Sequence, residues 1–119
     1  MEAKTLYYST NLKAPEVTFR EALLKGLAPD GGLYMPHRLP HFTARELDEI
    51  SELPYPYLAS EIIGRIIGNE IQRDDLENIC SEIYTFSVPI EIISEGKFLM
   101  RLDQGPTASF KDFAALLMG

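Results

Sequence analysis

The sequence has few of the residues that build disulfides or metal centres. Cys80 is the only cysteine, and His37 and His41 are the only histidines. A single cysteine cannot form an intramolecular disulfide or a cysteine-based metal cluster, which fits a reducing compartment. Cys80 shares a helical stripe with Leu76, so we expect it to be a small buried hydrophobic residue and not a reactive thiol.

The two histidines do not predict a metal site. Pro40 lies between His37 and His41, and Pro36 precedes them. Because proline interrupts a helix, the pair is expected on an extended loop and not on one helix face. No third ligand lies nearby in the sequence, so we predict no bound metal.

Basic residues and long apolar runs are also scarce. The chain has 11 lysines and arginines against 18 aspartates and glutamates, a formal net charge of -7. Nucleic acids and anionic membranes are bound by clustered basic residues, so binding to either is not expected. The acidic excess between Glu46 and Glu95 is typical of a solvated helix face. No apolar run approaches the roughly 20 residues of a membrane helix, and no secretory signal is present, so we expect a soluble cytoplasmic protein.

Two short strands are predicted near the N-terminus. Residues 5–9 are rich in β-prone side chains, and residues 33–35 can extend as a second strand that pairs with the first. Asp30 and Gly31 predict a tight turn before the second strand. Taken alone, the run GLAPDGGLYMP at residues 26–36 indicates only a glycine-rich reversal of the backbone.

Four helices are predicted from capping boxes and from apolar residues at helical spacing. They are placed from Thr18 to Gly26, from about Ala44 to Leu53, from Leu58 to Gly68, and from Asp74 to Phe86. Three begin with the pairs Thr18–Glu21, Thr43–Glu46 and Asp74–Glu77. In the first helix, Phe19, Leu23 and Leu27 share the expected apolar face. The stripes of the later helices are expected to pack on one another in a small layer.

The sequence changes character near residue 88. The short apolar runs at residues 90–93 and 98–102 are separated by Ser94, Glu95, Gly96 and Lys97, which predicts a strand, a turn and a strand. We therefore place a domain boundary near residue 88, between a domain at 1–88 and a segment at 89–119.

The run GPTASFKDF at residues 105–113 contains the main candidate functional residue, Lys111. Ser109 and Asp112 have capping-box spacing, which would make Lys111 the second residue of a helix. The positive end of the helix dipole and partial burial would both favour the neutral, nucleophilic amine. Such amines form Schiff bases with carbonyl compounds, pyridoxal phosphate among them. A first-turn lysine with its ammonium in water explains the spacing as well, so the local pattern does not decide the chemistry.

Gly105, Pro106 and Thr107 precede this helix, where backbone amides can hold an anion. The G-x-x-x-x-G-K spacing of a nucleotide P-loop is absent, so no nucleotide site is predicted.

Two separated motifs resemble those of threonine synthases. GPTASFKDFA, at residues 105–114, resembles the segment in which a lysine carries pyridoxal phosphate, and GLAPDGGLYMP resembles the signature of the N-terminal domain of that family. The motifs agree in order and in spacing. The likeness runs from the first strand to Gly119 and covers the beginning of an enzyme several times longer.

The resemblance implies a mixed α/β fold. Residues 1–88 would form the N-terminal domain of a threonine synthase, with a short strand pair and several helices. Residues 89–119 would supply the first strands and helix of a fold-type II pyridoxal-phosphate catalytic domain.

The resemblance also implies an activity for the whole enzyme. It would be a carbon–oxygen lyase that converts O-phospho-L-homoserine and water to L-threonine and phosphate, the last step of threonine biosynthesis. Lys111 would bind pyridoxal phosphate covalently, be displaced by the substrate amine, and then move protons among the substrate carbons. The residues for the cofactor phosphate, the pyridine ring and the substrate would lie beyond Gly119.

Two other interpretations stay open from the sequence. The chain could be a non-enzymatic, acidic, mostly helical interaction module in which Lys111 is incidental, or it could belong to a different fold-type II pyridoxal-phosphate lyase.

The last apolar segment, residues 113–118, is hydrophobic all round, which is typical of a helix covered on every side. Because the chain stops there, we expect a truncated part of a larger protein. Its exposed apolar surface predicts self-association or disorder in isolation. The isolated chain is expected to be inactive because the residues for the cofactor and the substrate would lie beyond Gly119.

Overall fold

The structure is a computed structural model that describes residues 5–119. It is elongated, measuring 47 × 33 × 30 Å. The elements are β1 (Tyr7–Ser9), α1 (Phe19–Lys25), β2 (Tyr34–Pro36), α2 (Ala44–Ser51), α3 (Tyr55–Ile67), the 3-10 helix η1 (Gly68–Glu70), α4 (Arg73–Ile83), β3 (Ile90–Ser94), β4 (Lys97–Met100) and α5 (Asp112–Met118). The predicted mixture of helices and short strands is confirmed.

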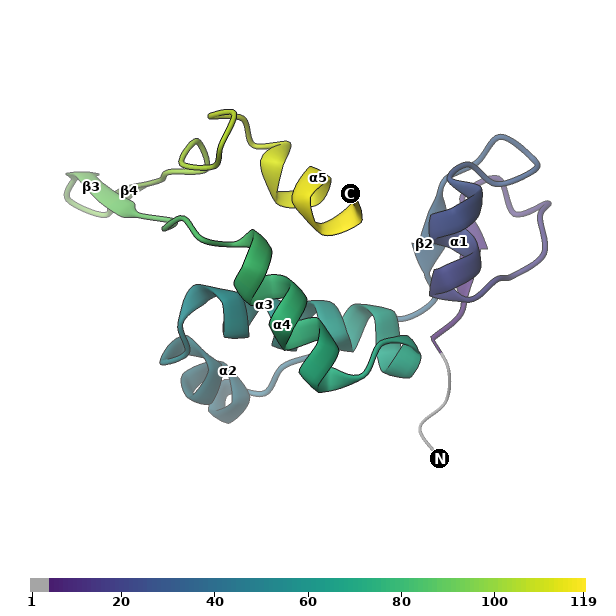
Figure 1. Ribbon diagram of the computed structural model, residues 1–119, viewed down its shortest axis with the longest axis horizontal. Coiled ribbons are helices and arrows are strands. Elements are labelled where there is room, and N and C mark those ends of the chain that lie inside the picture. Colours follow the sequence, from purple (N-terminus) through teal and green to yellow (C-terminus); the bar gives the residue numbers. More distant parts are fainter. Residues whose placement is uncertain (1–4) are drawn as a thin grey trace.

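Three parts follow one another along the molecule (Figure 1). The unit of β1, α1 and β2 lies at one end, and the layer of α2, α3 and α4 occupies the middle. The β3–β4 hairpin projects at the other end, from which the chain returns so that α5 contacts α4.

The predicted pairing of the first two strands is confirmed. β1 and β2 are antiparallel, with Tyr7 opposite Pro36 and Ser9 opposite Tyr34. Tyr7 also exchanges two backbone hydrogen bonds with Val17, of 2.8 and 3.0 Å. This small sheet provides the surface on which α1 packs.

The predicted ends of α1 are confirmed, but its predicted apolar face is wrong in part. Thr18 and Glu21 form the complete capping box, and Gly26 ends the helix with a φ of 72°. Ala22 is buried beside the half-buried Phe19, whereas Leu23 and Leu27 are exposed. The sheet below is too small to cover more than one row of side chains, and Leu27 lies beyond the end of the helix.

Asp30 organises the turn that the sequence predicted around Gly31. Its carboxylate accepts hydrogen bonds from the Ser9 hydroxyl at 2.6 Å, from the Gly32 N–H at 3.0 Å and from the Lys13 N–H at 3.0 Å. These bonds, the one from Ser9 foremost, lower the pKa of Asp30 below its ordinary value. A Cβ atom at Gly32 would collide with the Ser9 hydroxyl, so only glycine fits there. The run at residues 26–36 is therefore a turn closed by hydrogen bonds to the Asp30 side chain, and more than a simple reversal of the backbone.

The helices of the middle layer begin for different reasons. Thr43 and Glu46 form the complete capping box predicted for α2. The box predicted from Asp74 and Glu77 is wrong: α4 begins at Arg73 without a side-chain cap. The Glu77 carboxylate accepts a hydrogen bond from the Arg73 Nε at 3.0 Å instead, which uses the group that a box would need.

The main core lies between α3 and α4. Its buried members are Ala59, Ile67, Leu76, Cys80 and Tyr84. Cys80 has no exposed surface, and burial raises the pKa of its thiol, so the prediction of a small buried hydrophobic residue is confirmed. The first unit is tied to this layer by the Tyr7 hydroxyl, which donates to the Ile66 carbonyl at 2.9 Å.

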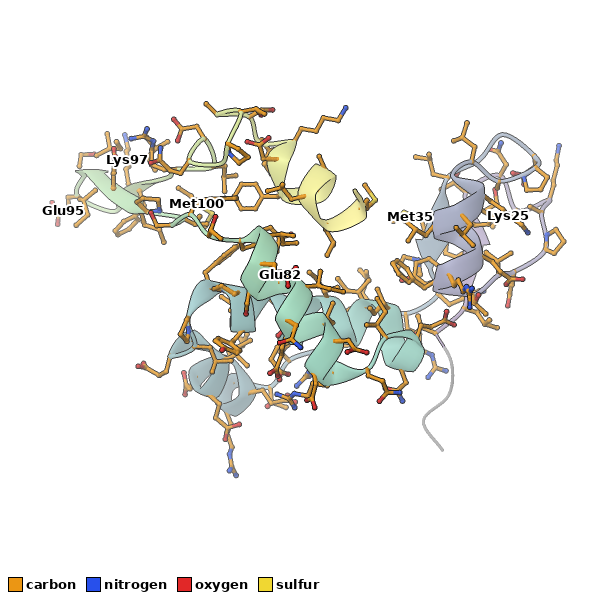
Figure 2. The ribbon with its side chains drawn as sticks, viewed as in Figure 1. Lys25, Met35, Glu82, Glu95, Lys97 and Met100 are labelled. Atoms are coloured by element: carbon orange, nitrogen blue, oxygen red, sulfur yellow. The ribbon has the colours of Figure 1, made fainter. Side chains whose placement is uncertain are left out.

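The predicted hairpin is confirmed, with its second strand ending at Met100 and not at residue 102. β3 and β4 pair antiparallel, with Ile90 opposite Met100 and Ile92 opposite Phe98. Every residue of both strands is exposed. Figure 2 shows Glu95 and Lys97 at the outer end of the hairpin, with Met100 nearer to α4. Nothing in the described part of the chain packs on this apolar ribbon, and the boundary near residue 88 stays a prediction.

Across residues 5–119, no helix combines the length and the apolar character needed to cross a membrane.

Glu46 makes the stability of the protein depend on pH at the acid end. The Thr43 backbone N–H and the Arg65 guanidinium hold the pKa of Glu46 at about 2, against an ordinary value of 4.5. A carboxyl with a lowered pKa stabilises the fold above pH 4.5, and that contribution disappears as the pH falls towards 2. We expect Glu46→Gln to be less stable at pH 7 and to lack this part of the acid dependence in thermal unfolding. Glu49→Gln, which removes only an exposed pair with Arg45, is the control. A Glu46→Gln curve parallel to that of the wild type would contradict the assignment.

Removing the hydroxyl group from each of two tyrosines in the first unit should change the stability of the protein in opposite directions. The Tyr34 hydroxyl is buried and has no hydrogen-bond partner in the described part of the chain, whereas the Tyr7 hydroxyl bonds to Ile66. A buried unpaired polar group costs about 1–3 kcal/mol, so Tyr34→Phe should raise the free energy of unfolding by about 1 kcal/mol. Tyr7→Phe should lower it by a similar amount. Denaturant unfolding measures both, and a loss of stability in Tyr34→Phe would mean that its hydroxyl is paired.

Candidate functional site at the lysine loop

Lys111 immediately precedes α5. The prediction that it is the second helical residue is wrong by a short distance: α5 begins at Asp112, and Lys111 is its N-cap residue. Its φ of -62° and ψ of -21° are already helical. The difference arises because the turn at residues 109–112 is hydrogen-bonded over three residues, with the Asp112 N–H donating to the Ser109 carbonyl at 3.0 Å.

The predicted capping box of Ser109 and Asp112 forms only in part. The Ser109 hydroxyl accepts a hydrogen bond from the Lys111 N–H at 3.2 Å, and the Ser109 N–H reaches the Asp112 carboxylate at 3.5 Å. Helix assignments commonly differ by one or two residues where such turns precede a helix. The stronger partner of Asp112 lies elsewhere.

That partner is Thr107. The Asp112 carboxylate accepts hydrogen bonds from the Thr107 backbone N–H at 2.9 Å and from the Thr107 hydroxyl. These bonds, the hydroxyl first, lower the pKa of Asp112 despite the opposing effect of burial. Asp112 is 5% exposed, so a charged carboxylate is enclosed here with its hydrogen bonds satisfied. The sequence predicted only a capping role for Asp112. Thr107 and Asp112 are five residues apart, which is not the spacing of a capping box, so no sequence motif indicates this contact.

The loop that leads to Lys111 is tightly folded. Ala108 has a φ of 55°, in the left-handed region that alanine rarely occupies. Its N–H donates to the Gly105 carbonyl at 3.0 Å. A Cβ atom at Gly105 would lie 2.6 Å from the Asp112 carboxylate, so the backbone passes as close to Asp112 as glycine permits.

Phe113, on the other flank of Lys111, is docked in the core. The Tyr84 hydroxyl donates to the Phe113 carbonyl at 2.7 Å. The Phe113 ring meets Phe86 edge-on at 5.4 Å and Tyr55 at 6.2 Å. Burial raises the pKa of Tyr84 to about 12, so its hydroxyl stays a hydrogen-bond donor at neutral pH. The far side of α5 is not covered within residues 5–119, and Met118 is 62% exposed.

The side chain of Lys111 is exposed. The described residues therefore do not supply the partial burial that we expected around it. Within residues 5–119, no acidic side chain forms an ion pair with its amine. A primary amine without a carboxylate partner is available to a carbonyl group, which is the chemistry that covalent attachment of pyridoxal phosphate requires.

The backbone amides before α5 do not form an open anion site. The N–H of Thr107 is bonded to the Asp112 carboxylate, and that of Ala108 is bonded to Gly105. The anion that this loop binds is the chain's own Asp112 carboxylate. These residues fit a lysine-presenting loop and do not fit a cradle for the phosphate of the cofactor.

The other candidates from the sequence lie elsewhere. His37 is on a loop, as predicted, where its Nε2 lies 2.6 Å from the Glu16 carboxylate. Its ring is tilted by 43° against that of Tyr8, with the centroids 5.1 Å apart. His41 contributes its carbonyl oxygen to a hydrogen bond from Arg65 at 3.2 Å. In the described part of the chain, no three histidine, cysteine, aspartate or glutamate side chains come together as a possible metal site.

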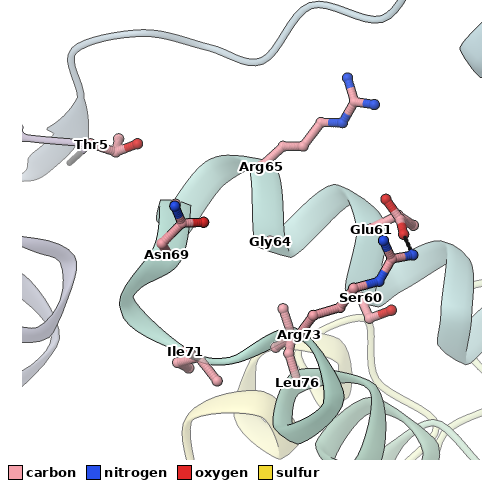
Figure 3. Close-up of a pocket in the computed structure, with 10 residues that line it drawn as sticks. Thr5, Ser60, Glu61, Gly64, Arg65, Asn69, Ile71, Arg73 and Leu76 are labelled. Atoms are coloured by element: carbon pink, nitrogen blue, oxygen red, sulfur yellow. Dashed lines mark hydrogen bonds and ion pairs between the residues drawn. The ribbon is translucent and has the colours of Figure 1, made fainter. Parts of the chain in front are cut away.

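A surface hollow lies between α3, η1 and the start of α4 (Figure 3). Arg73 lies against Glu61, to which it is ion-paired, and Arg65 points away from Leu76 towards its own partner, Glu46. The charged groups around the hollow are thus already paired. Its lining comes from Thr5 and from residues between Ser60 and Leu76, so it is separate from the lysine loop.

A second hollow adjoins the lysine loop. It is lined by the end of α4 and the residues after it, by Gln104, Gly105 and Pro106, and by Leu116 of α5. Lys111 is not part of this lining. The hollow therefore lies beside the loop and is not the place to which the amine is directed.

Comparison with known proteins identifies the family of this chain. The family model described as "Threonine synthase N terminus" matches residues 6–84. The threonine synthase of Pseudomonas aeruginosa is 38% identical over 118 residues, which cover 95% of this chain and 25% of that protein. The chain thus spans about a quarter of the length of the relatives that it matches.

Two solved structures extend the likeness to three dimensions. The pyridoxal-phosphate-bound threonine synthase of Brucella melitensis is 37% identical with a TM-score of 0.90, over 96% of this chain and 26% of that one. The threonine synthase of Escherichia coli is 31% identical with a TM-score of 0.89, over 95% and 26% of the two chains. By the family model and by these relatives, the chain belongs to the threonine synthase family.

Proposed function

We propose that this chain is the N-terminal part of a threonine synthase in which Lys111 binds pyridoxal phosphate. The whole enzyme would be a carbon–oxygen lyase that converts O-phospho-L-homoserine and water to L-threonine and phosphate. The observation that carries the proposal is the exposed amine of Lys111, which has no ion-pair partner among residues 5–119. The backbone around it is held by the hydrogen bond from Thr107 to Asp112 and by the one from Tyr84 to the Phe113 carbonyl. The solved relative from Brucella melitensis binds pyridoxal phosphate, which supports the same cofactor here.

Lys111 would do two things in this reaction. Its Nζ would hold the cofactor through a covalent bond and give it up to the amine of the substrate. The freed amine, still tethered to α5, would then move protons at the substrate carbons as an acid and a base. The bound cofactor supplies an electron sink for the carbanions formed at those carbons.

The described residues account for only part of such a site. The Thr107 amide of the lysine loop is bonded to Asp112 and the Ala108 amide to the Gly105 carbonyl, so the cofactor phosphate would be bound by other residues. The groups that hold the pyridine ring and the substrate are also expected outside residues 5–119. We therefore expect the isolated chain to form no threonine.

Two further properties follow from the same proposal. The apolar side chains exposed on the hairpin and on α5 would cause the isolated chain to self-associate. The free thiol of Cys80 fits a reducing compartment, and we place the enzyme in the cytoplasm.

Replacement of Lys111 tests the proposal directly in the full-length protein. Incubation with pyridoxal phosphate, borohydride reduction and peptide mapping should place the label on Lys111. Lys111→Ala should take no label at this peptide and should lose threonine formation by about 10³-fold, the scale of a lost acid–base catalyst. Lys97→Ala, at the exposed tip of the hairpin, should behave as the wild type. A label that spares Lys111 would favour the non-enzymatic alternative, and full turnover by Lys111→Ala would mean that a different residue does the work assigned to Lys111.

The substrate is tested separately. Turnover of phosphohomoserine should exceed that of serine and of threonine by the wild-type protein. A preference for serine or threonine would assign the chain to another pyridoxal-phosphate lyase of the same fold group.

A further inference from the structure

We propose that Asp112 and Thr107 are positioning residues for Lys111: their contact, called here the carboxylate clasp, fixes the direction in which the Lys111 side chain leaves the loop. The inference rests on the proposed function of Lys111. It concerns residues that act through Lys111 and that do not themselves touch the cofactor or the substrate.

The clasp closes the lysine loop on itself. The Asp112 carboxylate accepts hydrogen bonds from both the N–H and the hydroxyl of Thr107, so two donors of one residue bind one carboxylate. Hydrogen bonds to an ionised acceptor are roughly twice as strong as neutral ones. Because Asp112 is buried, a lost donor would leave part of a charged group without compensation.

The clasp also offsets strain in the loop. The left-handed conformation is strained for alanine, and Ala108, with a φ of 55°, lies between the two clasped residues. Such a conformation persists only where its surroundings determine it. Gly105 contributes by allowing the backbone to approach Asp112 without a side chain in between.

The two residues after Lys111 face inward and are both held. Asp112 is held by Thr107, and Phe113 is held by the Tyr84 hydroxyl and the aromatic rings around it. Lys111 itself is exposed, and the Phe110 ring before it lies 6.1 Å from the Phe113 ring. When Asp112 and Phe113 are fixed, the direction of the Lys111 side chain is fixed as well. The clasp therefore acts on Lys111 through one peptide unit.

A merely structural role for Asp112 would look different. An acidic residue in the first turn stabilises a helix through the dipole alone, and that effect does not require Thr107. The clasp requires the Thr107 hydroxyl. Variants of Thr107 therefore separate the two roles while leaving Asp112 in place.

The first measurement is made on the cofactor-free, full-length protein. We expect amide hydrogen exchange over residues 105–109 to become at least about tenfold faster in Thr107→Val and in Asp112→Asn, because loop opening needs fewer bonds to break. Thr107→Ser keeps both donors and should match the wild type. Gly105→Ala should also speed exchange, since its Cβ would force the Asp112 carboxylate away without removing any donor or acceptor.

The second measurement concerns Lys111 itself. In Thr107→Val and Asp112→Asn, we expect the rate of borohydride-fixed labelling at Lys111 and the kcat for threonine formation to fall by up to about 10²-fold, the cost of a small misplacement. KM should change little, because these residues do not contact the substrate. Thr107→Ser should restore both rates.

The outcomes are distinct from those that test the function of Lys111. Unchanged exchange in Thr107→Val and Asp112→Asn would overturn the clasp. Faster exchange with unchanged labelling and kcat would overturn its positioning role for Lys111. A wild-type protein that takes no label at Lys111 would overturn the proposed function and with it the positioning role. The exchange data would still show in that case whether the loop is closed by these two residues.

Discussion

Tyr84 is the residue on which the arrangement of this chain depends. Its ring is buried in the core that α3 and α4 share, and its hydroxyl holds the backbone of α5 at Phe113. α5 is a short helix, too short to be stable in water by itself. The Tyr84 hydrogen bond and the packing of the Phe113 ring on Phe86 and Tyr55 fix the place of the chain after the hairpin, and with it that of Lys111. The helical layer thus serves as the support for the lysine loop.

Hydrogen-bonded aspartates close both sequence motifs that carry the family resemblance. Asp30 gathers the Ser9 hydroxyl and two backbone amides around the GLAPDGG turn, and Asp112 gathers Thr107 around the GPTAS turn. In each case a carboxylate accepts the amides that a tight turn leaves unpaired, and a glycine allows the backbone to come close enough. The two loops are therefore stabilised by the same physical device, although only one of them presents a lysine.

Local signals in the sequence predicted well where no other residue takes the atoms that they need. The capping boxes at Thr18 and Thr43 form as expected because all their atoms lie within four residues. The box expected at Asp74 fails because Arg73 takes the Glu77 carboxylate. The apolar face of α1 was predicted too wide because helical spacing contains no information on how much surface the neighbouring sheet offers.

The sequence by itself determined the strand pair, the four amphipathic helices, the hairpin, the burial of Cys80 and the candidate lysine, because turn residues, caps and apolar periodicity act over a few positions. Only the tertiary structure decided that Asp112 turns back to Thr107 and that Tyr84 reaches the carbonyl of Phe113. The second of these contacts joins residues 29 positions apart, and the first depends on the left-handed bend at Ala108. Contacts of this kind follow from the path of the backbone in space, which the spacing of residue types does not specify.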